Sequence, residues 1–113
     1  MKLVHRGRVL ADGVVFYRNP FLRALGLRYS LKPKPIVLVS SSESVSGCAI
    51  DMFFVFFPID VLWLDSDKKV VDFKTNVKPF ALPIKPRMPA RFVVELPKGF
   101  LKGVKLGDKV IFE

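Results

Sequence analysis

The sequence has very few of the residues that carry common catalytic chemistry. Among its 113 residues there is one cysteine, Cys48, and one histidine, His5. A single cysteine excludes a disulfide within the chain, and a nucleophile paired with histidine would have to use His5. The usual zinc sites need several such ligands. We therefore predict no catalytic residue, no metal site and no cofactor.

Amide residues are scarce as well. The chain has no glutamine and only two asparagines, whereas it has 9 prolines. Few labile amides and many prolines are typical of proteins from thermophiles. The opening residues, M-K-L-V-H-R-G-R, carry charges where a signal peptide would have an apolar core. Together with the lone cysteine, this favours a cytoplasmic protein.

Acidic residues are outnumbered: 10 Asp and Glu stand against 19 Lys and Arg, which gives a net charge of +9. The basic residues concentrate toward the two ends of the chain. Such a surface attracts nucleic acids or acidic membranes without specificity. Weak binding of polyanions through the basic termini is one hypothesis, but no aromatic residues interleave the basic runs as a stacking platform would need.

The most apolar stretch runs from Ala49 to Asp65. It is rich in aromatic and β-branched residues and is interrupted by Pro58, so it predicts two strands that meet at the proline. A membrane-spanning helix is excluded because Asp51 and Asp60 would each cost about 2.5–3.5 kcal/mol at bilayer depth. Strands that are apolar on both faces need cover on both.

Short elements flank this stretch. An Asp12-Gly13 pair predicts a hairpin turn near the N-terminus, and Asn19-Pro20 followed by Gly26 predicts a short capped helix. Further strands are expected over 36–39, 70–77, 90–96 and 109–112. Residues 1–113 thus predict one mainly β domain, a small antiparallel β-barrel-like fold with one or two short helices.

Three candidate sites emerge. The aromatic residues of the core stretch could line an apolar pocket or a self-association surface: Phe53, Phe54, Phe56, Phe57 and Trp63. The serine-rich segment 40–47 could hold an anion through Ser40, Ser41 and Ser42, although a plain polar loop explains it better, because nothing in the segment fixes a phosphate-binding geometry.

The third candidate is Asp60, which shares a strand face with leucines and therefore needs a partner. We predict that Arg91 pairs with it, with Lys78 or backbone N–H groups as alternatives. A small hydrolase that uses Asp60 is a possible function, but structural pairing explains the residue better.

Four segments resemble one known family: F-L-R-A-L-G-L-R-Y at 21–29, F-F-V-F-F-P-I-D-V-L-W-L-D at 53–65, V-V-D-F-K-T-N-V-K-P at 70–79, and the stretch from 89 to 110. The chain is identified as similar to the domain-of-unknown-function 192 family. The resemblance implies a mostly β fold with short helices and brings no activity, cofactor or catalytic residue. Two positions depart from the pattern: Lys68 stands where a glycine is common, and Asp51-Met52 replaces an aromatic or His-Thr pair.

These observations favour a non-enzymatic binding or accessory module over an enzyme. Its partner would be a small apolar ligand or a second copy of the chain. Nucleic-acid association through the basic ends is the alternative from another class, and a hydrolase built on Asp60 is the third.

Overall fold

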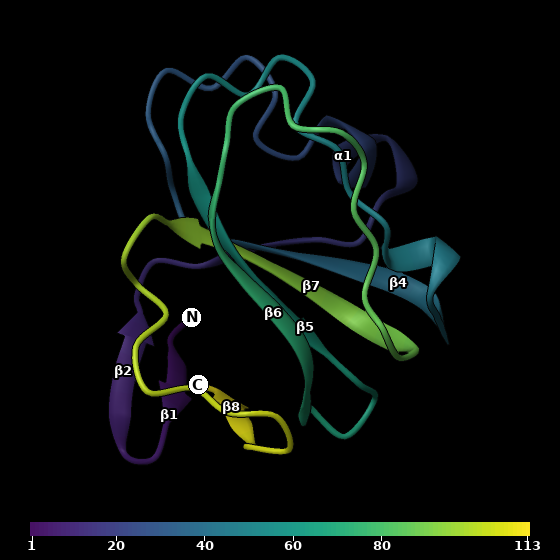
Figure 1. The fold of residues 1–113 in the computed structure, drawn as a ribbon. Coiled ribbons are helices and arrows are strands. Elements are labelled where there is room, and N and C mark those ends of the chain that lie inside the picture. The colour runs from purple at the N-terminus through teal and green to yellow at the C-terminus, as the bar shows by residue number, and fades with distance from the viewer.

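The computed structural model describes all residues from Met1 to Glu113. Two sheets make up most of it (Figure 1). The smaller sheet has the order β2-β1-β8 and consists of β1 (Leu3–His5), β2 (Arg8–Ala11) and β8 (Val110–Phe112). The larger has the order β3-β4-β7-β5-β6 and consists of β3 (Val15–Tyr17), β4 (Ile36–Ser44), β5 (Ile59–Leu64), β6 (Val70–Val77) and β7 (Ala90–Pro97).

The mainly β prediction is confirmed, but the sheets do not close into a barrel. All strand pairs are antiparallel except β3 and β4, which run parallel. A parallel pair needs a crossover connection, and the segment 18–35 with its helix provides it. None of the helices has the length and apolar character that a membrane crossing requires.

The larger sheet is covered on both faces, as the doubly apolar pattern of β5 predicts. Leu62 and Leu64 belong to a core that β1 and β8 also enter, whereas Val61 and Trp63 belong to a second core. The second core lies beneath α1 (Pro20–Leu25) and the long loops. Successive strand residues point to opposite faces, so one strand supplies both cores.

The helix predicted at Pro20 is confirmed. The Asn19 side chain accepts hydrogen bonds from the backbone N–H groups of Phe21 (2.8 Å) and Leu22 (3.4 Å), which satisfies donors that the first helical turn leaves free. Gly26 follows the helix with φ of 51°, a backbone conformation that favours glycine. A one-turn 3₁₀-helix, η1 (Ser46–Cys48), is the second short helix.

Two predictions about local structure are wrong. The N-terminal hairpin turns at Arg6-Gly7, while Asp12-Gly13 forms a bend that carries the chain from one sheet to the other. Residues 51–58 form turns rather than a strand, because this segment passes over the face of the sheet instead of joining its edge. Ile50, just before this segment, forms an isolated bridge with Ile84.

Candidate functional site

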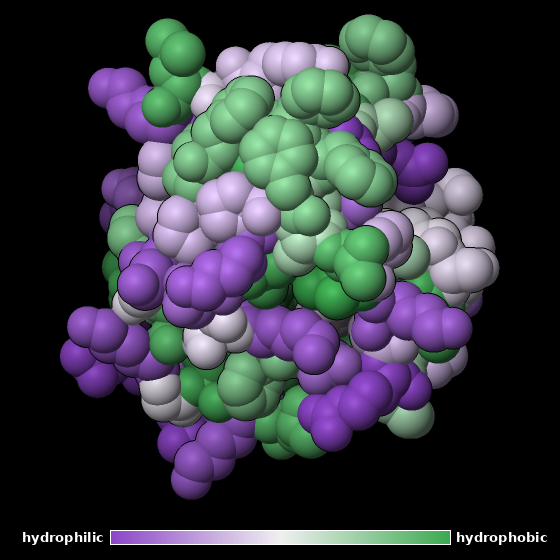
Figure 2. All heavy atoms as spheres, turned by 45° about the horizontal axis from the view of Figure 1, so that its top comes forward, coloured by the Kyte–Doolittle hydropathy of each residue, from purple (hydrophilic) through white to green (hydrophobic).

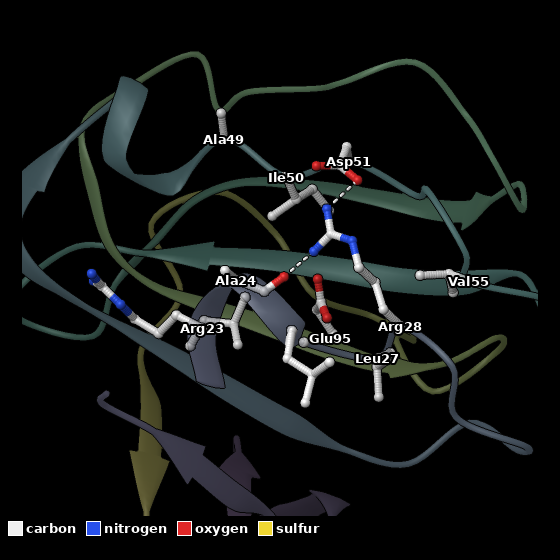
Figure 3. A pocket seen from close by; sticks show the side chains of 12 residues that line it. Arg23, Ala24, Leu27, Arg28, Ala49, Ile50, Asp51, Val55 and Glu95 are labelled. Carbon is white, nitrogen blue, oxygen red and sulfur yellow. Dashed lines mark hydrogen bonds and ion pairs between the residues drawn. The ribbon is translucent and has the colours of Figure 1, made fainter. Parts of the chain in front are cut away.

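A cavity of about 270 Å³ lies between α1, the residues that follow it and the segment 49–55 (Figure 3). It exceeds the roughly 150 Å³ that holds a benzene molecule in an apolar protein core. Eight of its lining residues are apolar or glycine, namely Ala24, Leu25, Gly26, Leu27, Leu38, Ala49, Ile50 and Val55. The charged lining residues are Arg23, Arg28, Asp51 and Glu95.

Glu95 lies on β7 with its side chain directed toward this cavity (Figure 3). It is 5% exposed, and no protein group donates a hydrogen bond to its carboxyl group. Burial raises the pKa of Glu95 to about 7, with the positive charge of Arg28 lowering it and the negative charge of Asp51 raising it. The carboxyl group therefore changes protonation near neutral pH and keeps unused hydrogen-bonding capacity.

An ion pair spans the cavity above Glu95. The Arg28 guanidinium donates hydrogen bonds to the Asp51 carboxylate and to the carbonyl oxygen of Ala24 (Figure 3). The same Asp51 oxygen accepts a hydrogen bond from the backbone N–H of Phe53 at 3.0 Å. These contacts tie the end of α1 to the segment 49–55, so they hold the two sides of the cavity at a set distance.

Sequence reasoning did not identify Glu95 as a functional residue. The signal was present in the alternation of the strand, because Glu95 falls on the same side as Val93, which is buried in the second core. A charged residue on an apolar strand face must be paired, neutralised or turned toward a cavity. Gly26 lies beside this carboxyl group: a Cβ atom at that position would meet Glu95 Oε1 at 3.6 Å, an ordinary van der Waals contact.

A neighbouring cavity of about 240 Å³ extends the groove toward Cys48. The Cys48 thiol is buried and donates to the carbonyl oxygen of Ala90 at 3.1 Å, and burial raises its pKa. It therefore stays protonated at neutral pH and is a poor nucleophile. His5 lies in the smaller sheet, where it contacts Asp108 at 2.8 Å, so the thiol and the imidazole do not meet.

Asp60 is buried, and its carboxylate is satisfied by three backbone groups. It accepts hydrogen bonds from the N–H groups of Asn76 (2.9 Å), Gly99 (3.0 Å) and Leu101 (3.1 Å). The pair predicted between Asp60 and Arg91 does not form, because the two residues lie toward opposite ends of the β5–β7 ladder. Arg91 instead donates to the carbonyl oxygen of Ser40 at 3.0 Å. The backbone alternative is the correct one.

The five aromatic residues that were predicted to line one apolar pocket lie in different environments. Trp63 is fully buried and donates to the carbonyl oxygen of Cys48 at 2.8 Å, whereas Phe53, Phe54 and Phe56 are about half exposed and Phe57 is half-buried. The five residues do not line one cavity, because the turns of 51–58 direct most of the rings outward.

The serines lie in an extended strand rather than in a loop. Ser40, Ser41 and Ser42 belong to β4, where Ser40 is buried and its two neighbours are exposed. The β4–β7 register shifts between Val39 and Ser44, and Ser40 and Ser41, without Ser42, line an open pocket of about 320 Å³ together with Arg18, Arg23 and Arg91. No group of three or more His, Cys, Asp or Glu residues is placed to hold a metal ion.

The comparison with known proteins decides the family. The family model DUF192, described as an uncharacterized ACR family, matches residues 3–112. The chain belongs to the DUF192 family. A UPF0127 protein of Pyrococcus horikoshii is 35% identical over 88% of this chain and 87% of its own length. A UPF0127 protein of Pyrococcus furiosus is 31% identical over 95% and 92%.

Among solved structures, a proposed transcription regulator of Sinorhizobium meliloti superposes on this DUF192 chain with a TM-score of 0.86 and 25% identity, over 97% of this chain and 89% of that protein. The two relatives from Pyrococcus are from thermophilic archaea, in agreement with the thermophile-like composition.

One departure of this chain from the DUF192 pattern has a clear structural basis. Lys68, at the position where a glycine is common, lies in the β5–β6 turn with φ of 62°, a conformation that glycine adopts without strain. Its ammonium group lies 5.7 Å from the ring centre of Phe92 and 5.3 Å from that of Phe112. Contacts of a cation with aromatic faces offset part of the backbone cost.

Proposed function

We propose that this chain is a small-ligand-binding module and that the Glu95 cavity is its binding site. The observation that carries the proposal is the buried Glu95 carboxyl group, which faces a cavity and receives no hydrogen bond from the protein. Buried polar groups are nearly always hydrogen-bonded, and the Glu95 oxygens open onto the cavity, so a ligand bound there can supply the partner that the chain does not.

The surroundings of Glu95 favour an uncharged head group on the ligand. Arg28 and Asp51 neutralise each other beside it, and the Arg23 guanidinium points away to the carbonyl oxygen of Val39. An added anion would therefore lack a free counter-ion, and an added cation would find only Glu95, whose carboxyl group is partly protonated near pH 7. An amide or hydroxyl group can donate to the ionised carboxylate or accept from the protonated carboxyl group. The apolar lining would cover a small hydrocarbon body.

The same cavity does not favour catalysis. Its one thiol neighbour, Cys48, is held protonated by burial, and no histidine lies in the groove. A carboxyl group with a pKa near 7 could serve as a general acid or base, but no second polar group is placed beside it as a nucleophile. Binding is therefore the function that the geometry supports best.

Three probes with a shared branched body test the proposal: isobutyramide, isobutyrate and isobutylamine. Amide chemical shifts should be followed by NMR during titration of each probe into the full chain. We expect isobutyramide to shift the signals of residues 26–28 and 50–55 and to bind more tightly than the two charged probes. If no probe moves these signals at about 10 mM, a concentration far above the dissociation constants of ordinary ligands, the proposal is wrong.

A pair of variants makes the test specific. Glu95→Leu removes the hydrogen-bonding group at similar size and should weaken isobutyramide binding by about tenfold, the effect of one hydrogen bond to a charged group. Glu43→Leu makes the same substitution at an exposed position near the end of β4 and should leave the affinity unchanged. Equal affinity of the Glu95→Leu variant and the unaltered chain would contradict the assignment of Glu95.

A further inference from the structure

We propose that one end of the molecule docks onto an anionic lipid surface through a cluster of exposed aromatic rings. The cluster, here called the aromatic surface, consists of Tyr29, Phe54, Phe56 and Phe80. It is built by three loops, 26–35, 49–58 and 78–89, which lie together at the top of the molecule in Figure 1. The inference is independent of the ligand proposed for the cavity.

The four rings form a continuous series. Tyr29 stacks on Phe54 with ring centres 5.2 Å apart, Phe80 contacts Phe54 edge-on at 6.0 Å, and Phe56 contacts Phe80 edge-on at 5.5 Å. Each residue is nevertheless between 47% and 63% exposed. Figure 2, which brings this end forward, shows hydrophobic rings gathered in one area with hydrophilic side chains around them. Contiguous apolar areas of this kind usually mark an interaction site.

The backbone holds these rings outward in an unfavourable conformation. Tyr29, Phe54 and Phe80 have φ values of 62°, 58° and 59°, a region that bulky residues rarely adopt. Backbone hydrogen bonds lock them there, from Tyr29 N–H to Phe54 O and from Phe80 N–H to Met52 O, both 2.9 Å. Strained residues concentrate at functional sites, and three of them meet on this one surface.

The charges of the three loops point to an anionic partner. Lys32, Lys34, Lys78 and Lys85 are exposed, and none of them takes part in an ion pair. The loops contain one acidic residue, Asp51, and its charge is already neutralised by Arg28. Lysines near an anionic bilayer each strengthen binding, and apolar side chains with a basic rim supply the two signals that stable peripheral attachment needs.

A lipid surface fits these loops better than a nucleic acid or a second copy of this chain. Leu31 is 99% exposed and Leu82 is 80% exposed, and such aliphatic side chains insert among acyl chains but do not stack on bases. Tyr29 and Phe54 also stack face to face on each other, whereas single-stranded nucleic acid needs free ring faces. A second copy of this chain would bring unpaired lysines against lysines.

Flotation with lipid vesicles tests the proposal on the full chain. Vesicles of phosphatidylcholine alone should be compared with vesicles that contain about one quarter phosphatidylglycerol, an anionic lipid. We expect at least about tenfold more bound protein on the anionic vesicles, with a marked loss at about 0.5 M salt because screening weakens the lysine contribution. Equal binding to both vesicles, or none to either, would overturn the proposal.

Variants locate the binding surface. The double variant Phe56→Ser with Leu82→Ser should lose about tenfold in vesicle binding, and Lys32→Glu with Lys78→Glu should lose the preference for anionic lipid. Leu106→Ser and Lys105→Glu alter exposed residues outside the three loops and serve as matched controls. Circular dichroism and thermal unfolding confirm that each variant folds.

Two further results would replace the lipid surface by another partner. A dimer that forms with rising protein concentration and disappears in the Phe56→Ser, Leu82→Ser variant would identify a second copy as the occupant. Binding of single-stranded DNA that is lost in the same variant, without vesicle binding by the unaltered chain, would identify nucleic acid. Vesicle binding that survives in the double variant would show that the aromatic surface is not involved.

Discussion

Asp60 and Glu95 are two buried carboxyl groups on neighbouring strands, and their environments are opposite. Asp60 pairs with Leu96 across the β5–β7 ladder, and Glu95 pairs with Val61 one position away. Because adjacent strand positions alternate, the two side chains leave the sheet on opposite faces. Asp60 receives three backbone hydrogen bonds, whereas Glu95 receives none and faces a cavity.

The difference separates a structural carboxylate from a candidate binding group. Asp60 bonds to Asn76, which adopts φ of 52° where the β5–β6 register shifts, and to two residues of the turn after β7. It thereby holds two irregular backbone segments against the sheet. Glu95 contributes no such contact, and its burial raises its pKa, so a ligand is the better explanation for a carboxyl group at this position.

The largest effect is expected when the backbone contacts of Asp60 are removed. Asp60→Ala leaves three backbone donors without a partner and should lower the free energy of unfolding by about 3–5 kcal/mol. Urea unfolding measures the loss, and Asp67→Ala, in the exposed β5–β6 turn, is the control. A loss below about 1 kcal/mol, the value of a single ordinary hydrogen bond, would contradict the structural role of Asp60.

Glu95 should show the opposite response to neutralisation. Its pKa is about 7 in the folded chain against an ordinary value of 4.5, so between these values the folded state binds more protons than the unfolded state. The contribution of this raised pKa to the free energy of unfolding is fully present below pH 4.5. It is lost as the pH rises to about 7, and the total loss is about 3 kcal/mol.

Glu95→Gln should therefore remove this pH dependence and raise the free energy of unfolding relative to the unaltered chain by up to about 3 kcal/mol at about pH 8. Urea unfolding across the pH range measures the difference. Parallel pH profiles for the two proteins would show that Glu95 is not perturbed by burial.

The Arg28–Asp51 pair offers a finer test of the Glu95 environment. Arg28→Met removes a positive charge and should raise the pKa of Glu95 further, whereas Asp51→Asn removes a negative charge and should lower it. Each variant should cost about 1 kcal/mol of stability, because the pair is only partly buried. NMR titration of the Glu95 carboxyl carbon follows the pKa, and shifts in the same direction for both variants would contradict the geometry.

The smallest effect is expected at Arg91. Arg91→Met removes one hydrogen bond to Ser40 and should cost about 1 kcal/mol. Combined with Asp60→Ala, the losses should add within about 0.5 kcal/mol, because the two side chains share no partner. A strongly non-additive double variant, measured by thermal unfolding, would restore the direct pairing that the sequence suggested.

Local sequence signals predicted several elements correctly. The cap formed by Asn19, the β5–β6 turn at Asp65 and the strand Ala90–Pro97 all follow from short-range chemistry that needs no tertiary context. The prediction for 51–58 failed because a run of aromatic residues has the same composition whether it enters a sheet or crosses over it. Here the segment crosses over the sheet, and Ile50, just before it, forms a bridge with Ile84, a residue distant in sequence.

The sequence by itself determined the family, the mainly β character and the requirement that Asp60 find a partner, because periodicity, capping residues and the cost of burying a charge are local properties. Only the tertiary structure decided which partner Asp60 has and that Glu95 lacks one. Both depend on how strands from distant parts of the chain align and where the loops pass. A shift of one residue in a strand register exchanges the two faces of a sheet, and with them the roles of two carboxyl groups.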